Sequence, residues 1–80
     1  MDQAVAMWVA QDKKCAICFR ELASPEFAVK GRKDLPFIDH SHETLKVRGI
    51  LCAGCNLALG LLEDDIQRMK NAIAYLEKAT

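Results

Sequence analysis

The sequence predicts a small zinc-stabilised α+β domain, in which two short strands and a helix form the centre and one further helix lies toward each end. Three observations support this class. The chain has 80 residues, and a chain of that length buries only about 60 to 65% of the surface that its unfolded form exposes, so it needs a staple. Four cysteines form two Cys-x-x-Cys pairs, each called a knuckle below. Strand-like patterns lead into the second knuckle, and helical patterns follow it.

The N-terminal part is expected to contain a helix over residues 2–13 that runs into the first knuckle. Its apolar residues have the i, i+3, i+4 spacing that is typical of an amphipathic helix, namely Val5, Trp8 and Val9. Residues 19–34 contain proline, glycine and several charged residues, which predicts a loop with at most an irregular strand. Because no linker separates the patterns, residues 1–80 are expected to form a single domain.

The central part is expected to be a β-hairpin. Residues 35–38 lead into Asp39-His40, and residues 46–51 lead into the second knuckle. These two runs have the composition of short strands and flank a turn at about 41–45.

Two helices are expected after the hairpin. The first covers residues 53–59 and ends at Gly60, because glycine tolerates the left-handed conformation of a helix C-terminus. The second covers residues 64–78, with Asp64 or Asp65 near its N-terminus, where a negative charge suits the helix dipole. Its apolar stripe consists of Ile66, Met69, Ile73 and Leu76. Four leucines in and just after the first helix are expected to form a core between the two helices and are also a candidate homodimer surface: Leu57, Leu59, Leu61 and Leu62.

Charge excludes a strong overall attraction to nucleic acid or to an anionic membrane, because eleven basic residues balance eleven acidic ones. Phosphate binding must therefore be local, and the best candidates are Lys30, Arg32, Lys33 and, on the second strand, Arg48. No apolar stretch approaches the roughly 20 residues needed to cross a bilayer. The first residues have neither a basic region nor an apolar run, so we expect no signal peptide and a cytoplasmic location.

The two knuckles predict one zinc ion with four thiolate ligands: Cys15, Cys18, Cys52 and Cys55. Four thiolates close the tetrahedral shell and leave no position for water or substrate, so this zinc is expected to be structural and to contribute on the order of 10 kcal/mol to folding. A redox knuckle usually occurs singly and near a βαβ pattern, and two disulfides would need an oxidising compartment. Both alternatives are less favoured.

A second metal site is expected where the hairpin meets the following helix. A ββα unit brings the end of the first strand beside the first turn of the helix, so that the Asp39 carboxylate and the Asn56 amide oxygen can converge on one ion. Two hard oxygen ligands suit Mg²⁺ or a similar ion that fills its other positions with water and phosphate oxygens. His40 would lie next to such an ion and could take a proton from an attacking water.

At these residues the chain resembles the phage recombination endonuclease VII family, which belongs to the HNH, or His-Me finger, nucleases. The resemblance covers about residues 8–76. The motifs that carry it are Cys15-Ala16-Ile17-Cys18, then Asp39-His40-Ser41-His42-Glu43-Thr44, then Val47-Arg48-Gly49-Ile50-Leu51-Cys52-Ala53-Gly54-Cys55-Asn56, and Leu59-Gly60. At two turn positions the family commonly has glycine, where this chain has Phe19 and Leu45.

The resemblance implies a ββα-metal fold and an endodeoxyribonuclease that hydrolyses DNA phosphodiester bonds and leaves 5′-phosphate and 3′-hydroxyl ends. It assigns Asp39 and Asn56 to a catalytic Mg²⁺ or Mn²⁺ ion and makes His40 the general base. It also suggests that His42 contacts phosphate or helps to position the ion. Arg48 is expected either to clamp phosphate or to pair with an acidic residue. The partner is DNA, and a phage-encoded protein would act in the host-cell cytoplasm.

Two alternatives stay open. A resolvase of branched DNA would use the same chemistry, but the resolvase for which the family is named has a further C-terminal region that helps it to dimerise and to recognise branches. A non-catalytic zinc ribbon that binds nucleic acid would explain the knuckles. It would leave Asp39, His40 and Asn56 without a shared purpose.

Overall fold

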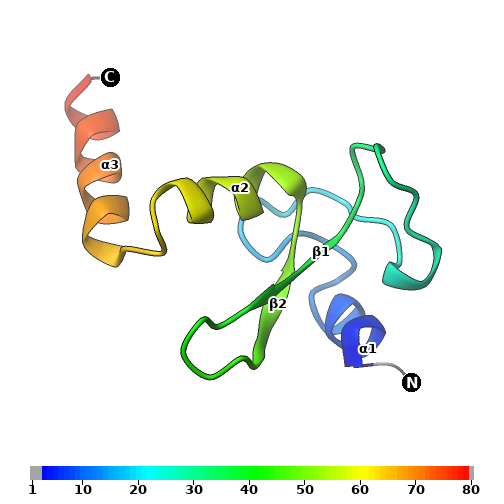
Figure 1. Cartoon of the computed structure of the whole chain (residues 1–80). Coiled ribbons are helices and arrows are strands. Elements are labelled where there is room, and N and C mark those ends of the chain that lie inside the picture. The colour runs from blue at the N-terminus through cyan, green and yellow to red at the C-terminus, as the bar shows by residue number, and fades with distance from the viewer. Residues whose placement is uncertain (1–2, 80) are drawn as a thin grey trace.

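A computed structural model describes residues 3–79 and shows a small α+β structure with three α-helices and a two-stranded sheet (Figure 1). The elements follow in the order α1 (Gln3–Ala10), the 3₁₀ helix η1 (Pro25–Phe27), β1 (Phe37–His40), β2 (Val47–Leu51), α2 (Ala53–Leu61) and α3 (Ile66–Ala79). The expected class is confirmed at this level. The molecule is elongated, with extents of 43 × 29 × 22 Å.

Helix α1 is shorter than predicted. It ends at Ala10, because Asp12 and Lys13 take left-handed backbone angles, with φ of 57° and 62°. The backbone N–H of Lys13 donates to the Trp8 carbonyl at 2.8 Å and closes the helix end. The predicted extension to residue 13 is therefore wrong, and the predicted start at residue 2 lies outside the described residues.

The first knuckle lies in a tight turn that follows α1. An isolated bridge pairs Lys14 with Glu21, and the backbone N–H of Cys15 donates to the Arg20 carbonyl at 2.8 Å. The segments just before and just after the knuckle therefore run side by side in opposite directions. Beyond it, the predicted loop over residues 19–34 is confirmed, with only η1 as regular structure.

Strands β1 and β2 form the predicted antiparallel hairpin, and the register explains an irregularity next to Asp39. Asp39 pairs with Gly49, whereas the next residue, His40, pairs with Val47. Arg48 is therefore the extra residue of a β-bulge. Bulges re-aim side chains and are over-represented beside active sites.

The turn positions where the family commonly has glycine do require its backbone conformation. Phe19 has φ of 63° and Leu45 has φ of 62°. Both side chains are largely exposed. The left-handed region costs a non-glycine residue roughly 1–2 kcal/mol. Phe19 and Leu45 therefore hold a strained backbone conformation at these two turns.

We predict that Leu45→Gly stabilises the protein. The change relieves the left-handed strain at an exposed position, partly offset by the greater freedom of glycine in the unfolded chain, and should raise the free energy of unfolding by about 0.5–1 kcal/mol. Thermal unfolding of the zinc-loaded protein, followed by circular dichroism, should show a midpoint higher by about 3–6 °C.

Leu61→Gly is the matched control for this prediction. Leu61 is also exposed but lies in helix α2 with ordinary helical geometry, so the same substitution should lower the midpoint through helix propensity. A lower midpoint for Leu45→Gly as well would contradict the strain argument.

The core is small and contains two zinc-knuckle cysteines. Among the described residues the buried side chains are Ala4, Cys15, Leu22, Ile50, Leu51 and Cys52. Gln11 ties α1 to this core, because its side-chain amide accepts from the Ile50 N–H at 2.9 Å and donates to the Ile50 carbonyl at 3.0 Å. The amide thus pairs with the open edge of β2 as a neighbouring strand would.

Helix α2 runs through Gly60 rather than ending there. The backbone N–H of Leu62 still bonds the Ala58 carbonyl at 3.0 Å, and the chain leaves the helix at Glu63 and Asp64, which take the left-handed φ values. The prediction that Gly60 is a left-handed cap is wrong, and the helix ends two residues later than expected.

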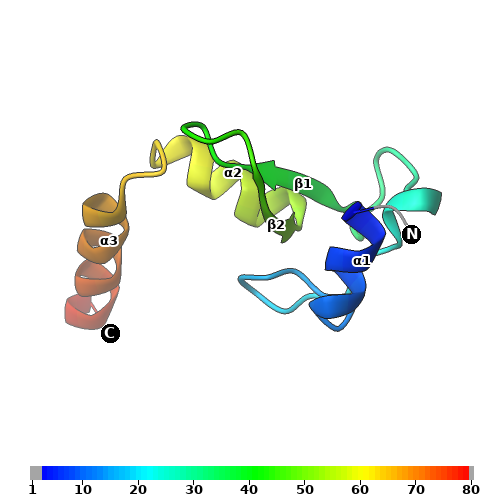
Figure 2. The same cartoon turned by 90° about the horizontal axis from the view of Figure 1, so that it is seen from below.

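Helix α3 stands apart from the rest of the molecule (Figure 2). Asp65 caps it, because its carboxylate accepts from the Arg68 N–H at 3.1 Å. The predicted core between α2 and α3 is wrong for three of the four leucines, because Leu57 and Leu61 are exposed and Leu59 packs against the central core instead. Within residues 3–79, every helix is too short or too polar to cross a lipid bilayer.

Candidate functional site

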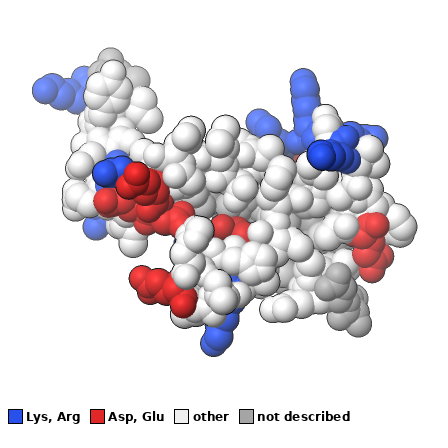
Figure 3. All heavy atoms as spheres, viewed as in Figure 1, with Lys and Arg blue, Asp and Glu red and all other residues white. Residues whose placement is uncertain are grey.

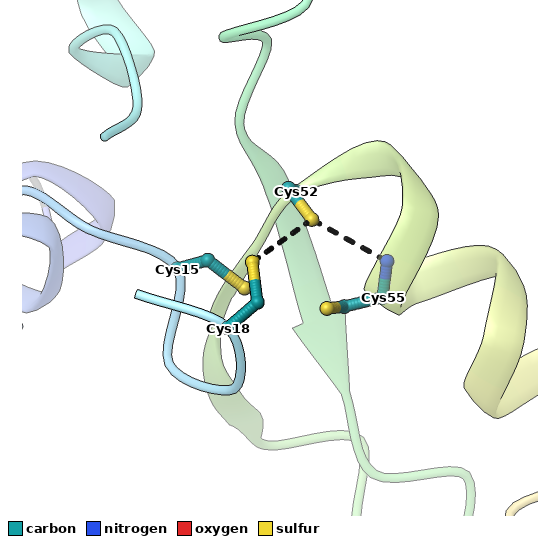
Figure 4. Close-up of side chains that lie close together, drawn as sticks. All are labelled: Cys15, Cys18, Cys52 and Cys55. Carbon is teal, nitrogen blue, oxygen red and sulfur yellow. Dashed lines mark hydrogen bonds between the residues drawn. The ribbon is translucent and has the colours of Figure 1, made fainter. Parts of the chain in front are cut away.

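The four cysteines converge at one point between the turn of the first knuckle and the start of α2 (Figure 4). Their sulfur atoms all lie within 4.8 Å of one another, and those of Cys18 and Cys52 are 3.7 Å apart. A tetrahedral zinc ion with Zn–S bonds of about 2.3 Å needs sulfurs about 3.8 Å apart. The predicted set of four ligands is therefore placed to bind one zinc ion.

Backbone hydrogen bonds hold the cysteine sulfurs in place at each knuckle. Backbone N–H groups donate to two of them at 3.4 Å, from Ile17 to Cys15 and from Cys55 to Cys52. Cys52 is also the N-cap of α2, so the second knuckle and the helix start are the same piece of chain. A metal ion here would fix the position of α2 relative to the first knuckle.

The pKa values of the Cys15 and Cys55 thiols are shifted in opposite directions. Burial alone raises the pKa of Cys15, but backbone hydrogen bonds, led by those of Cys18 and Cys52, outweigh it and lower the pKa to about 6. Burial, hydrogen bonds with the other cysteines and the charge of Cys15 raise the pKa of Cys55 to about 12. The Cys55 thiol thus keeps its proton at neutral pH, and binding of a metal ion would displace that proton.

Asp39 is held by Arg48. The Arg48 Nε lies 2.7 Å from Asp39 Oδ2, and Arg48 Nη2 lies 3.0 Å from Asp39 Oδ1. The Asp39 side chain is 14% exposed and the Arg48 side chain is 39% exposed, so solvent reaches this two-bond pair mainly from the Arg48 side. Hydrogen bonding to Asp39 raises the pKa of Arg48 above its usual value. The bulge at Arg48 makes the pairing possible, because it aims this side chain at its neighbour on β1.

Asp64 joins this group from the connection between α2 and α3. Its Oδ2 lies 3.3 Å from Arg48 Nη2 and 3.2 Å from His42 Nε2. Together with neighbouring side chains these residues line a cavity of about 440 Å³: Ser41, His42, Glu43, Arg48, Glu63 and Asp64. Figure 3 shows acidic side chains gathered beside the connection between α2 and α3.

The side chains of His40 and Asn56 have no hydrogen-bond or ion-pair partner within residues 3–79. His40 is exposed at the end of β1, and Asn56 is half-buried in the second turn of α2. Asn56 does not cap the helix, because Cys52 occupies the cap and the Asn56 N–H donates to the Cys52 carbonyl at 3.0 Å.

Asp39 lines a second, smaller cavity, which extends to α2. This cavity has a volume of about 250 Å³ and is also lined by Leu59 of α2, and β1 contacts α2. Asn56 precedes Leu59 by three residues and so shares its face of the helix. A carboxylate and an amide from these two elements are hard oxygen donors that leave positions free for water and phosphate.

The basic candidates Lys30, Arg32 and Lys33 lie elsewhere. They belong to the exposed loop between η1 and β1, over which basic side chains stand in Figure 3. Arg32 pairs with Asp34 at 3.1 Å. No ion pair within the described part of the chain joins this loop to Asp39 or His42.

Asp64 is a member of the site that the sequence did not suggest. The sequence shows only an acid near the start of a helix, and Asp65, not Asp64, takes that capping role. Asp64 reaches Arg48 because the chain reverses at the left-handed residues Glu63 and Asp64, where the backbone N–H of Asp64 donates to the Leu59 carbonyl at 2.9 Å. No residue pattern signals that reversal.

Comparisons with known proteins extend over nearly the whole chain. The family model described as recombination endonuclease VII matches residues 1–78. The chain is 36% identical over 74 residues to the Gene 59 protein of Mycobacterium phage D29, which covers 91% of this chain and 40% of that protein. It is 37% identical over 76 residues to the Gene 59 protein of Mycobacterium phage L5, covering 94% and 42%. The chain thus spans about two-fifths of the length of these curated relatives. No solved structure matches it.

Proposed function

Because this chain belongs to the recombination endonuclease VII family, we propose that it is a metal-dependent endonuclease that hydrolyses DNA phosphodiester bonds. Family membership indicates a nuclease that acts on DNA. The finer proposal is that residues 1–80 act as one domain of the HNH, or His-Me finger, type, with a ββα-metal core made by β1, β2 and α2. The observation that supports it most is that Asp39 lies on a cavity shared with the face of α2 that carries Asn56.

Each residue of the proposed site has a role that its surroundings allow. Asp39 and Asn56 would hold the ion through oxygen atoms, and the zinc among the cysteines would keep α2 in place. When bound, a divalent ion such as Mg²⁺ or Mn²⁺ would supply a Lewis acid for the scissile phosphate and the leaving 3′ oxygen. His40 would act as general base, since its exposed imidazole has no partner within residues 3–79 and is free to accept a proton from water.

The remaining candidates have roles in holding DNA. Arg48 and His42 lie beside the site and would contact phosphate, whereas Lys30, Arg32 and Lys33 would bind the backbone farther away. Phosphate contacts of this kind position a duplex without reading its sequence. The exposed leucines Leu57 and Leu61 are a candidate homodimer surface. The relatives are phage proteins, which is in keeping with action in the cytoplasm of a host cell.

The test is cleavage of supercoiled plasmid by the zinc-loaded chain, with Mg²⁺ or Mn²⁺ added. We expect nicked or linear products with 5′-phosphate ends, and no products when the divalent ion is omitted. A panel of linear, single-stranded and four-way-junction DNA separates a general endonuclease from a resolvase, which would prefer the junction. Binding of DNA without cleavage of any of these substrates would favour the non-catalytic zinc ribbon.

A further inference from the structure

Arg48 occupies the atoms of Asp39 that a cation would need. Both carboxylate oxygens of Asp39 accept hydrogen bonds from Arg48, one from Nε and one from Nη2. Two-bond pairs of guanidinium and carboxylate are among the stronger charge-assisted interactions of proteins. The Asp39 carboxylate is 14% exposed and the Arg48 side chain 39% exposed, so solvent screens the pair only in part. A cation therefore cannot use these oxygens fully while Arg48 keeps both bonds.

We propose that Arg48 is a latch on Asp39, which a divalent cation must displace, and that Asp64 receives the guanidinium on release. This inference rests on the proposed ion at Asp39. Arg48 is then a positioning residue that sets the affinity for the cation, in addition to any contact with phosphate.

Asp64 lies close enough to accept the Arg48 guanidinium when it leaves Asp39. Its Nη2 already lies 3.3 Å from Asp64 Oδ2, so the guanidinium can give up Asp39 and keep a carboxylate partner throughout. The cavity of about 440 Å³ on the Asp64 side is lined by Arg48 itself and offers space for the turn. Glu43 and Glu63 line the same cavity, and their negative charge favours a guanidinium there.

The backbone holds the receiving carboxylate in position. The N–H of Asp64 donates to the Leu59 carbonyl at 2.9 Å, which fixes the residue against the end of α2. His42 lies 3.2 Å from the same Asp64 oxygen but is 85% exposed and can swing aside into solvent. The movement therefore needs only side-chain rotation.

The first test compares Arg48→Lys and Arg48→Ala in cation binding. The probe is Mn²⁺, titrated into the full zinc-loaded chain and followed by the loss of the electron paramagnetic resonance signal of the free ion. Lysine keeps the positive charge but offers a point charge instead of the two-pronged fork, so Arg48→Lys should bind Mn²⁺ about threefold more tightly than the unmodified protein. Arg48→Ala removes both the positive charge and the two-pronged guanidinium, and this variant should bind Mn²⁺ about tenfold more tightly than the unmodified protein.

The second test asks whether Asp64 acts through Arg48. Asp64→Asn removes the receiving carboxylate, so it should weaken Mn²⁺ binding about threefold when Arg48 is present and leave it unchanged in the Arg48→Ala background. Arg68→Ala is the matched control, because Arg68 also bridges two carboxylates, Glu63 and Asp65, but lies on α3. It should not change the Mn²⁺ affinity. Zinc content is measured throughout, and the thiolate site should retain zinc, since Mn²⁺ binds such ligands weakly.

The outcomes separate the latch from the proposed function. If Arg48→Ala binds Mn²⁺ more tightly but Arg48→Lys does not, charge repulsion alone explains the effect and the latch is refuted. Unchanged or weaker binding in both variants, with binding still lost in Asp39→Asn, also refutes the latch and leaves the proposed ion at Asp39 standing. Equal effects of Asp64→Asn in both backgrounds refute the role of Asp64. Binding that ignores Asp39→Asn in every variant overturns the latch and the proposed ion together.

Discussion

Serine in place of Cys52 is expected to abolish the folded state and DNA cleavage together. Cys52 is buried at the centre of a small core, caps α2 and is one of the four converging sulfur ligands. Serine is a good helix cap and differs little in size, so the substitution tests metal binding more than capping or packing. A structural zinc contributes on the order of 10 kcal/mol, about as much as the whole stability of a typical domain.

The measurement is far-UV circular dichroism and zinc content of the purified variant, followed by the plasmid assay. Ala53→Ser is the matched control, because it places the same side chain at the next, exposed position. It should keep one zinc per chain, the native spectrum and cleavage. Removing zinc from the unmodified protein with a strong chelator should reproduce the Cys52→Ser spectrum, and adding zinc should reverse it. A folded, active Cys52→Ser protein without zinc would refute the structural role of the metal.

The parts of this fold that local patterns control were predictable. The hairpin and the four-cysteine cluster follow from short sequence signals: two runs of strand-like composition on either side of a turn, and two knuckles that each present two sulfurs. The left-handed turns at Phe19 and Leu45 were visible only through the family, which commonly has glycine there. The residues themselves do not signal such a conformation, because bulky side chains disfavour it.

The parts that depend on distant contacts were not predictable. Nothing in the sequence shows that Arg48 is a bulge residue, yet the bulge is what turns it onto Asp39. Gln11 completes the edge of β2 from 39 residues away, and a glutamine after a helix has no sign of that role. The apolar stripe of α3 predicts a buried face but cannot name what covers it, and Ile66, Ile73 and Leu76 are exposed.

The candidate site shows the same division. The residue types and their order predicted Asp39, His40 and Asn56 as a group, and the structure brings Asp39 to a cavity shared with the helix of Asn56. Which of them are free and which are paired depends on side-chain geometry. Asp39 is paired with Arg48, whereas His40 and Asn56 have no side-chain partner among residues 3–79. A base that must take a proton from water should be free, and a metal ligand can be held by a counter-ion until the metal arrives.

The second large prediction concerns His40, whose side chain is unpaired within residues 3–79. His40→Ala should lower the rate of DNA cleavage by about 10²–10⁴-fold, the contribution typical of a positioned general base. Stability should change little, because the His40 side chain is exposed and has no partner within the described residues. The plasmid assay under single-turnover conditions gives the rate, and circular dichroism with zinc content verifies the fold.

Chemical rescue distinguishes a general base from a structural histidine. The exposed end of β1 leaves room for a free imidazole molecule at the truncated position, so adding imidazole to His40→Ala should restore part of the cleavage rate in proportion to its neutral form. The variant should still bind Mn²⁺, since its proposed oxygen ligands Asp39 and Asn56 are unchanged. A His40→Ala protein that cleaves at the normal rate would return His40 to a surface role. Loss of activity together with loss of Mn²⁺ binding would instead make the imidazole a ligand of the ion, because a base that only accepts a proton from water leaves cation affinity intact.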